Sequence, residues 1–462
     1  MRSLFYIFCI SSFINYSTGN HVDANTNIKM PEEIQLTSGE SGFYINHIQC
    51  FSRGDEWIVF DKRNDDSKIG STGSIGIVSV NDGTVKEIYR TEHQTEFGPG
   101  VGAAAFSPVS NRVIFIHGIR NANDKNPYAF TRRTGVAIDI SGPYKPIFMD
   151  ARDVDRPFTK GALRGGTHAH SWSGDGEWIS FTYNDYILEQ LSKENANVKD
   201  LRTIGVMVPG KVVVAHDSAF ENNSGEMFSA IVAEVTENPK WGSNEIEKAS
   251  DECWLGSNGY IKKNGTRQQR AIAFQGNLRD IDGNLKTEVF VADLPNDVSK
   301  AQHNLPLEGT TSTRPNVAAG VVNRRITYTK NGVQGPRHWL RAKSDGSLIA
   351  FLSKDDKGII QIFGVSPNDD KIVQVTHNPF PVQGPFNFSP NNESIAYTAD
   401  NSVFVTDVNS GKTKRVSDRF MDEEKPVGAV VWSNNGRMLA YNRFKKMGAG
   451  KFLHIFLLKD MD

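Results

Sequence analysis

The sequence WSGDGEWISF at residues 172–181 decides the fold. An aromatic residue and a serine come first, a tight turn of Gly and Asp follows, and an alternating run from Glu177 to Phe181 completes the stretch. Gly and Asp tolerate left-handed backbone angles, so this order predicts two antiparallel strands joined by a short turn.

The same pattern recurs along the chain, which indicates a repeat protein. Five further copies begin at Phe51, Phe106, Ala342, Phe388 and Trp432. Most copies are followed by a third and a fourth alternating run, as at 359–365 and 373–376. Four short strands per unit are typical of a β-propeller, in which neighbouring blades cover each other's sheet faces.

A seventh unit is inferred between residues 212 and 330, where the pattern is weakest. Its four expected strands are Met227–Val235, Arg270–Gln275, Glu288–Asp293 and Arg325–Thr329. An insertion over about 237–268 interrupts them and contains a helix-like stretch from Glu245 to Trp254. The sequence therefore predicts an all-β fold, a seven-bladed β-propeller of four-stranded antiparallel blades with WD40-like repeats.

The two ends of the chain are expected to meet. The last unit stops after its third strand, 452–458, and the isolated strand 33–37 is predicted to supply the fourth, so that the propeller spans 33–462. Residues 1–20 have the pattern of a cleaved signal peptide, and 21–32 form an N-terminal tail. The apolar run of the signal peptide, 4–14, is shorter than the roughly 20 residues that a membrane span needs. We expect a periplasmic or secreted monomer without a membrane span.

Charge and cysteine content exclude some functions. The chain has 52 basic and 53 acidic residues and no basic block, which argues against a nucleic-acid partner. Cys50 and Cys253 remain after signal removal, and both a single disulfide and two buried thiols stay open.

Three segments, at 163–185, 335–356 and 377–397, are similar to TolB-like β-propellers, in particular to the periplasmic proteins often called biopolymer transporter Tol. The resemblance covers almost the whole mature chain and implies the same fold. A more distant likeness is to oligogalacturonate lyases, seven-bladed propellers that hold manganese through a Gln-x-x-His-x-His motif. Here His168 and His170 match its histidines, whereas Gly165 stands where the Gln is expected. This likeness implies a divalent metal and an anionic sugar substrate.

Aligning the six clear copies on the turn places three histidines at one level, four residues before the turn. The occupants of that column are His47, Gly102, His168, His338, Gly384 and Gly428. The column lies at the start of the innermost strand, near one mouth of the channel. Imidazoles converging from separate strands can hold a divalent ion, so His47, His168, His170 and His338 are predicted metal ligands for Zn or Mn. Hydrogen bonding of each histidine within its own blade stays open as the alternative.

Other side chains near this mouth suit an anionic oligosaccharide. Arg can hold a carboxylate bidentately, a Trp face can stack on a sugar ring, and His and Tyr can act as base and acid in β-elimination. The predicted catalytic residues are His170, Tyr183, Tyr186 and Arg164, and the predicted substrate-binding residues are Arg337, Trp339 and Gln383. A loop salt bridge is the alternative for each arginine.

Two functions remain open from the sequence. One is a metal-assisted carbohydrate lyase that acts on an anionic oligosaccharide. The other is a non-catalytic periplasmic propeller that binds an envelope protein or glycan. In both cases the channel mouth is the expected working surface.

Overall fold

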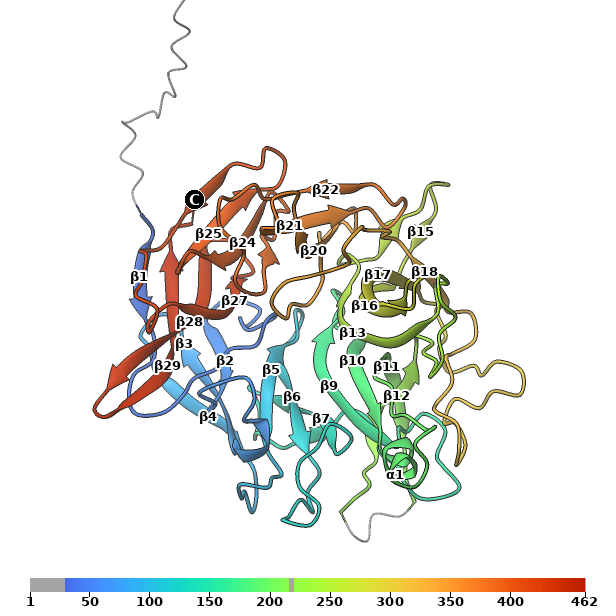
Figure 1. Cartoon of the computed structure of the whole chain (residues 1–462). Helices are drawn as coiled ribbons and strands as arrows, with labels where there is room; N and C mark the ends of the chain where they lie inside the picture. The colour runs from blue at the N-terminus through green and yellow to red at the C-terminus, as the bar shows by residue number, and fades with distance from the viewer. Residues whose placement is uncertain (1–29, 216–219, 462) are drawn as a thin grey trace, which may run out of the picture. The chain divides into compact units, whose positions relative to one another are not determined.

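The structure is a computed structural model that describes residues 30–215 and 220–461. The predicted signal peptide, 1–20, lies outside these residues. Seven antiparallel sheets surround a central axis (Figure 1), so the predicted seven-bladed β-propeller is confirmed. Within the described ranges, no helix has the length and apolar character to cross a membrane.

Each blade is a short antiparallel sheet, and the blades are numbered from the N-terminus. Blade 1 contains β2 (Trp57–Asp61), β3 (Ser74–Ser79) and β4 (Val85–Arg90). Blade 2 contains β5 (Val101–Phe106), β6 (Arg112–Gly118), β7 (Arg133–Asp139) and β8 (Ile147–Phe148). Blade 3 contains β9 (Gly165–Trp172), β10 (Ile179–Asp185), β11 (Thr203–Val212) and β12 (Gly225–Ile231). Blade 4 contains β13 (Ile246–Trp254), β16 (Ala271–Arg279), β17 (Leu285–Asp293) and β18 (Val322–Arg325).

The remaining blades follow the same plan. Blade 5 contains β19 (Arg341–Ala342), β20 (Ile349–Lys354), β21 (Ile360–Val365) and β22 (Ile372–Gln374). Blade 6 contains β23 (Asn387–Phe388), β24 (Ser394–Ala399), β25 (Ser402–Asp407) and β26 (Thr413–Arg415). Blade 7 contains β27 (Pro426–Trp432), β28 (Met438–Met447), β29 (Gly450–Lys459) and β1 (Glu32–Gln35). Outside the blades lie η1 (Ile69–Ser71), α1 (Tyr186–Glu194) and the hairpin of β14 (Tyr260–Ile261) and β15 (Arg267–Gln268).

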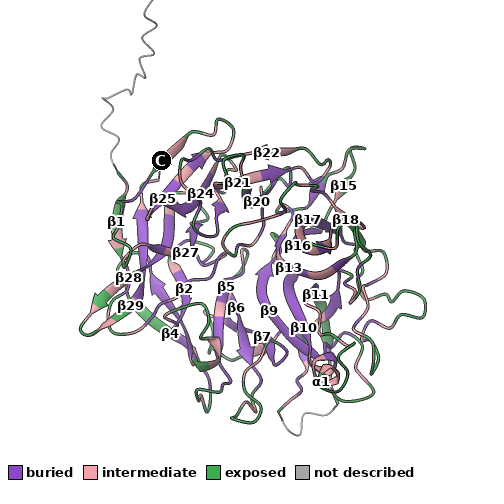
Figure 2. Cartoon of the chain, viewed as in Figure 1, coloured by how far each residue is buried: buried purple, intermediate pink, exposed green. Residues whose placement is uncertain are grey.

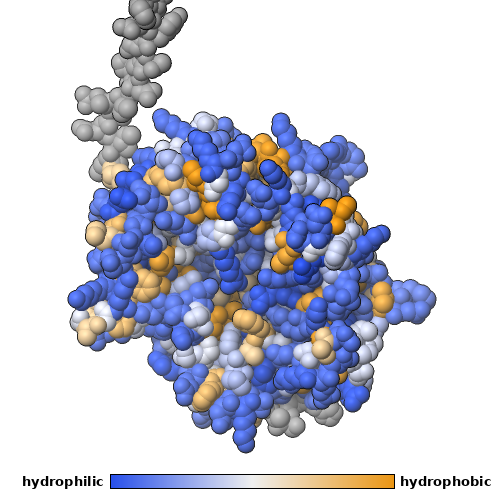
Figure 3. Space-filling model, in the orientation of Figure 1, coloured by the Kyte–Doolittle hydropathy of each residue, from blue (hydrophilic) through white to orange (hydrophobic). Residues whose placement is uncertain are grey.

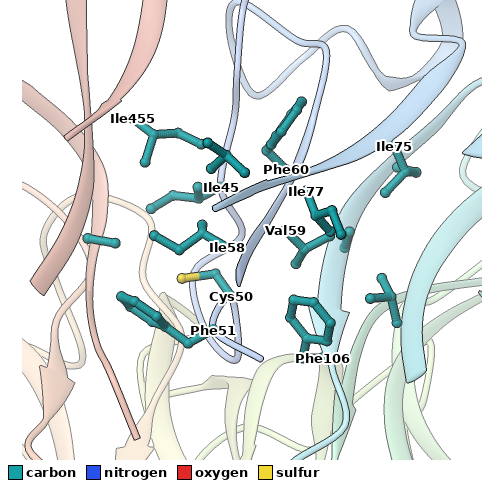
Figure 4. Close-up of a cluster of buried hydrophobic side chains, with 14 of the residues drawn as sticks. Ile45, Cys50, Phe51, Ile58, Val59, Phe60, Ile75, Ile77, Phe106 and Ile455 are labelled. Carbon is teal, nitrogen blue, oxygen red and sulfur yellow. The ribbon is translucent and has the colours of Figure 1, made fainter. Parts of the chain in front are cut away.

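The first described strand pairs with the last one. β1 runs antiparallel to β29, with Glu33 opposite Leu458, and so becomes the outer strand of blade 7. Beside this join, a buried cluster connects Ile455 of blade 7 with Phe60 of blade 1 and Phe106 of blade 2 (Figure 4). The inner strands of the blades are largely buried (Figure 2), because neighbouring blades cover both faces of each sheet, whereas outer strands such as β4 and β18 are more exposed.

Two expectations for the fourth blade are wrong. The stretch expected to be helix-like is the strand β13, and Met227 belongs to β12 of blade 3 instead of opening blade 4. Register shifts at Ile246/Lys248 and Ser250/Cys253 interrupt the strand alternation of β13. Its buried apolar residues Ile246, Ala249 and Cys253 consequently recur at intervals of three and four, which imitates a helix.

The innermost strands of four blades bulge at one level. Ala103, Ala169, Asp251 and Gly428 have φ angles of 54°, 56°, 54° and 73° in blades 2, 3, 4 and 7. The strand pairing slips beside each of them. A bulge redirects the side chains that follow it, and bulges are frequent next to binding sites.

Candidate functional site

A cavity of about 370 Å³ opens at the bulged end of the channel. Its wall is contributed by blades 1, 2, 3, 5, 6 and 7, through residues that include His47, Ala103, His168, Trp339, Pro385 and Gly428. Three of the six residues in the aligned column of histidines and glycines, His47, His168 and Gly428, therefore line this cavity. The surface of the face seen in Figure 3 is largely hydrophilic, and its apolar residues are scattered.

His47 is held from two sides by blade 5. Its ring stacks on Trp339, with ring centroids 3.6 Å apart and planes 9° from parallel. Its Nδ1 lies 2.7 Å from Nη2 of Arg341, which can only donate, so the ring hydrogen of neutral His47 must sit on Nε2. Burial, followed by the charges of Arg341 and Arg337, lowers the pKa of His47 well below its usual range. His47 is thus a fixed neutral donor in the cavity wall.

His168 lies in the wall contributed by β9. Burial and then the cations Arg133, Arg202 and Arg337 lower its pKa well below the usual value for histidine. Its Nδ1 is buried without a hydrogen-bond partner, and its ring lies over that of Phe130 with a centroid distance of 6.3 Å. His168 is therefore neutral and has an unused ring nitrogen.

The other two predicted metal ligands lie outside the cavity. Nε2 of His170 lies 3.0 Å from the hydroxyl of Thr167, which in turn donates to Asp150 at 2.8 Å. Burial lowers the pKa of His170 to about 3. Nδ1 of His338 faces the carbonyl oxygen of Pro336 at 2.9 Å, and its Nε2 accepts from the amide of Leu352 at 3.0 Å. Each of these two imidazoles is bonded within its own blade, so the expected convergence of four histidines does not occur.

Strand alternation explains why His338 is excluded from the cavity. The segment 337–341 enters blade 5 and spans the channel towards blade 1. Arg337 approaches Asp66, while Trp339 and Arg341 both contact His47. Alternate residues of an extended chain point to opposite sides, so His338 faces its own blade. The predicted binding residues Arg337 and Trp339 do line the cavity.

Arg341 closes the channel below the cavity. This buried side chain donates to the amide oxygen of Asn387 at 2.5 Å and to the carbonyl oxygen of His47 at 2.8 Å. Burial lowers its pKa to about 10, so it stays charged at neutral pH. Arg341 also lines a smaller cavity of about 220 Å³, whose lining residues are all different from those of the upper cavity. The two cavities are thus separated by this polar layer.

The predicted residues Arg164, Tyr183, Tyr186 and Gln383 are not part of the cavity wall. Arg164 is buried, pairs with Asp185 at 2.9 Å and donates to two loop carbonyl oxygens. This is the salt bridge that was the alternative to a catalytic role. Tyr183 is buried and donates to the same Asp185 at 3.0 Å, and its pKa is raised by burial. Tyr186 opens α1, and Gln383 is exposed and accepts from the Asn401 amide at 3.3 Å.

Three arginines in the cavity wall were not predicted from the sequence, namely Arg63, Arg133 and Arg202, and the last two lack a carboxylate partner in the described part of the chain. Arg133 is 2% exposed, and of its guanidinium nitrogens only Nη1 has a partner, the hydroxyl of Tyr128 at 2.9 Å. Arg202 donates to the side-chain oxygen of Asn184 at 3.1 Å. No carboxylate of the described residues lies within ion-pair distance of either cation. Both guanidinium groups lie over the ring of Phe130, at 4.8 and 5.1 Å.

The arginines repel one another. Burial lowers the pKa of Arg133, and the charge of Arg337 lowers it further. Burial, then Arg133 and Arg337, likewise lower the pKa of Arg202. The fourth arginine, Arg63, is neutralised by Asp61 at 2.6 and 2.9 Å. The cavity therefore carries an excess of positive charge, which an anion would offset.

These residues do not fit a divalent metal ion. The wall contains two histidines and three arginines that lack a tightly bound carboxylate, and its acidic residue Asp66 already contacts Arg63 and Arg337. The part of the chain that the structure describes contains no group of three His, Cys, Asp or Glu side chains arranged to hold a metal. A dication would be repelled where an anion is attracted.

Comparison with known proteins gives one close relative and a shared fold. The chain is 33% identical over 415 residues to the uncharacterized protein YidR of Escherichia coli (strain K12), covering 88% of this chain and 94% of that protein. A family model described as a protein of unknown function, DUF3748, matches residues 100–222. Among solved structures, an oligogalacturonate lyase in complex with manganese is similar with a TM-score of 0.52 and 9% identity, over 94% of this chain and 95% of that one. TolB from Acinetobacter baumannii is similar with a TM-score of 0.36 and 13% identity, over 88% of this chain and 81% of that one.

Proposed function

The chain belongs to the same family as Escherichia coli YidR, and on that premise we propose that it binds an acidic oligosaccharide in the cavity at the channel mouth. The observation that carries the proposal is Arg133, a buried cation in the cavity wall with two unpartnered guanidinium nitrogens. Leaving a buried charged group unpaired is costly, and a carboxylate held by guanidinium groups offsets that cost. Arg202 and Arg337 add to the same positive field.

A sugar accounts for the aromatic part of the wall. Trp339 is held flat by His47 on one side, and the guanidinium carbon of Arg337 lies 4.5 Å from the centre of its ring. Tyr44, Tyr128 and Phe130 add further rings around the same space. Flat apolar faces next to cations suit an acidic sugar, which combines an apolar ring face with a carboxylate. The fold of an oligogalacturonate lyase is consistent with a uronate ligand.

Calorimetric titration with trigalacturonate tests this function. We expect binding that weakens as salt is added, since charge pairing at a partly open mouth is screened by salt. The matched control ligand is the methyl ester of the same trisaccharide, which keeps the rings and removes the charges. Equal affinity for the acid and the ester would rule out recognition of carboxylates, and no binding of either would reject the function.

One observation favours a second function, β-elimination at the same site. His168 is neutral and lines the cavity beside the arginines. The hydroxyl of Tyr128 accepts from Arg133, which leaves its own proton free to be donated. In this reaction His168 removes the C5 proton of a uronate, a C4–C5 double bond forms as the C4–O bond breaks, and Tyr128 protonates the leaving oxygen. The arginines would stabilise the negative charge that develops on the carboxylate.

Ultraviolet absorbance of the unsaturated uronate distinguishes binding from catalysis. A lyase would produce this absorbance from trigalacturonate and lose it in His168→Gln. Binding without any absorbance change would leave the protein as a binding module. Either result is obtained from the same purified protein.

A further inference from the structure

Arg337 connects opposite sides of the cavity mouth. Its Nη1 lies 3.6 Å from Oδ2 of Asp66, in the loop after β2, and its Nε lies 3.4 Å from Oδ1 of Asp251, in β13. Asp66 belongs to blade 1 and Asp251 to blade 4. In a ring of seven blades these are separated by two blades on one side and three on the other, so the two ion pairs reach across the opening.

These contacts are long for charged hydrogen bonds, which are about 2.7–2.9 Å when well formed. The side chain of Arg337 is 52% exposed and that of Asp66 is 53% exposed. An ion pair between two exposed groups, such as Arg337–Asp66, typically contributes only about 0–1 kcal/mol. The carboxylate of Asp251 is 14% exposed, and its pair with Arg337 is weakened by the length of 3.4 Å. Arg63 contrasts with this, because it is 1% exposed and bound to Asp61 at 2.6 Å. Arg337 is therefore the cavity arginine whose carboxylate partners are most easily exchanged.

We propose that Asp66 and Asp251 are built-in competitors for the anionic ligand. In the empty protein their carboxylates occupy Arg337 and bridge the mouth, and a bound carboxylate displaces them. The proposal rests on the proposed function, since it concerns entry of the ligand into the same cavity. Its consequence is selectivity: a weakly bound anion cannot displace two carboxylates, whereas a ligand that also contacts Arg133 and Trp339 can.

Asp251→Asn is the sharper test of the two acids. Asn removes the charge, keeps the side-chain shape and tolerates the positive φ of 54° at this position. We expect Asp251→Asn and Asp66→Asn each to tighten trigalacturonate binding by about three- to fivefold, the equivalent of a weak ion pair. Asp65→Asn is the matched control, because Asp65 bonds to Ser67 in the same loop and should leave affinity unchanged.

Arg337→Gln provides the cross-check. It should weaken binding, and adding it to Asp251→Asn should abolish the gain of the single variant, because the competition acts through Arg337. If Asp251→Asn weakens binding as Arg337→Gln does, the carboxylates position Arg337 and do not compete, and the proposal is wrong.

A readout without sugar separates this proposal from the proposed function. Phenylglyoxal modifies accessible guanidinium groups, and peptide mass spectrometry reports the rate at Arg337. We expect phenylglyoxal to modify Arg337 faster in Asp251→Asn than in Asp65→Asn. Sulfate should also protect Arg337 at lower concentrations in Asp251→Asn than in Asp65→Asn. If trigalacturonate fails to bind but these effects appear, the displacement of Asp66 and Asp251 from Arg337 by an anion is supported, and the acidic oligosaccharide is rejected as the ligand. Unchanged modification and unchanged sulfate protection would overturn the exchange itself.

Discussion

Arg132 and Arg133 are adjacent in the chain but have opposite electrostatic surroundings. Arg132 holds the carboxylate of Glu221 at 2.7 Å, whereas the single hydrogen-bond acceptor of Arg133 among the described residues is the hydroxyl of Tyr128. The pair offers a matched comparison, because the two side chains are equally long and both are largely buried. One of them maintains the structure and the other provides charge to the cavity.

Arg133→Gln should weaken trigalacturonate binding by about tenfold or more, while the free energy of unfolding stays the same or rises by about 1 kcal/mol. Removing an unpaired buried charge relieves a desolvation cost and breaks no ion pair. Arg132→Gln should do the reverse, retaining affinity and lowering stability by about 1–2 kcal/mol, because Glu221 loses a partner. Calorimetry and urea unfolding measure the two effects. Equal losses of affinity in both variants would contradict the assignment.

Trp339→Leu should weaken trigalacturonate binding by about three- to tenfold, as expected for one aromatic contact, and leave sulfate binding nearly unchanged. Sulfate needs only the cations, whereas a sugar ring needs the flat face. Competition of sulfate against the trisaccharide in a calorimetric titration measures both. A parallel loss for the two ligands would mean that Trp339 acts by holding Arg337 in place.

Acid should destabilise the protein below pH 6.5. Burial lowers the pKa of His117 and His338 to about 4 and that of His170 to about 3. Between these values and the ordinary 6.5, the unfolded chain binds protons that the folded chain does not, so the free energy of unfolding falls as pH falls. Each histidine contributes a slope of up to about 1.4 kcal/mol per pH unit. Urea unfolding at several pH values from 7.5 to 5 measures the slope of the free energy of unfolding with pH. His117→Phe should reduce this slope, whereas His303→Gln, at an exposed position, should leave it unchanged.

Glu252 should act in the opposite direction. Burial raises its pKa from 4.5 to about 7, and one carboxylate oxygen is buried without a partner. Because the folded pKa is raised, its stabilising contribution is present below pH 4.5 and is lost as pH rises through about 7. Glu252→Gln should therefore raise stability by about 2 kcal/mol at pH 8 and leave it unchanged at pH 4.5. The amide oxygen can still accept from Thr182, which bonds to the carboxylate at 2.9 Å. Equal effects at both pH values would show that Glu252 does not titrate in this range.

The blades could be predicted because each repeat carries its own turn. Residues 172–181 and their five counterparts fix where two strands meet, and strand alternation follows from there. β13 could not be predicted in this way, because the bulge at Asp251 changes the phase of alternation within a single strand. A bulge is selected by contacts with the neighbouring blade and the channel, which a local pattern does not contain.

Of the predicted site residues, the structure brings His47, His168, Arg337 and Trp339 to the cavity and places the others elsewhere. Sequence spacing placed His338 in the column, whereas the extended chain directs Arg337 and Trp339 into the cavity instead. Arg133 and Arg202 were missed although a signal existed: Arg133 opens the third strand of blade 2, and Arg202 directly precedes that of blade 3. Aligning third strands as well as turns would have found them. The sequence could not show that Arg133 and Arg202 lack carboxylate partners, because the formation of ion pairs depends on which loops surround the cavity mouth.

Because β1 pairs with β29, the ring of blades can close only after residues 450–459 have been synthesised. A ribosome completes residues 32–35 long before residues 450–459 exist, so the ring stays open for the whole of translation. Contacts this distant in sequence form slowly, because the intervening chain must first be organised. The strand β1 must therefore wait for residues 450–459 before it can pair, and a chain cut short anywhere before β29 leaves the edge of a sheet exposed to other molecules.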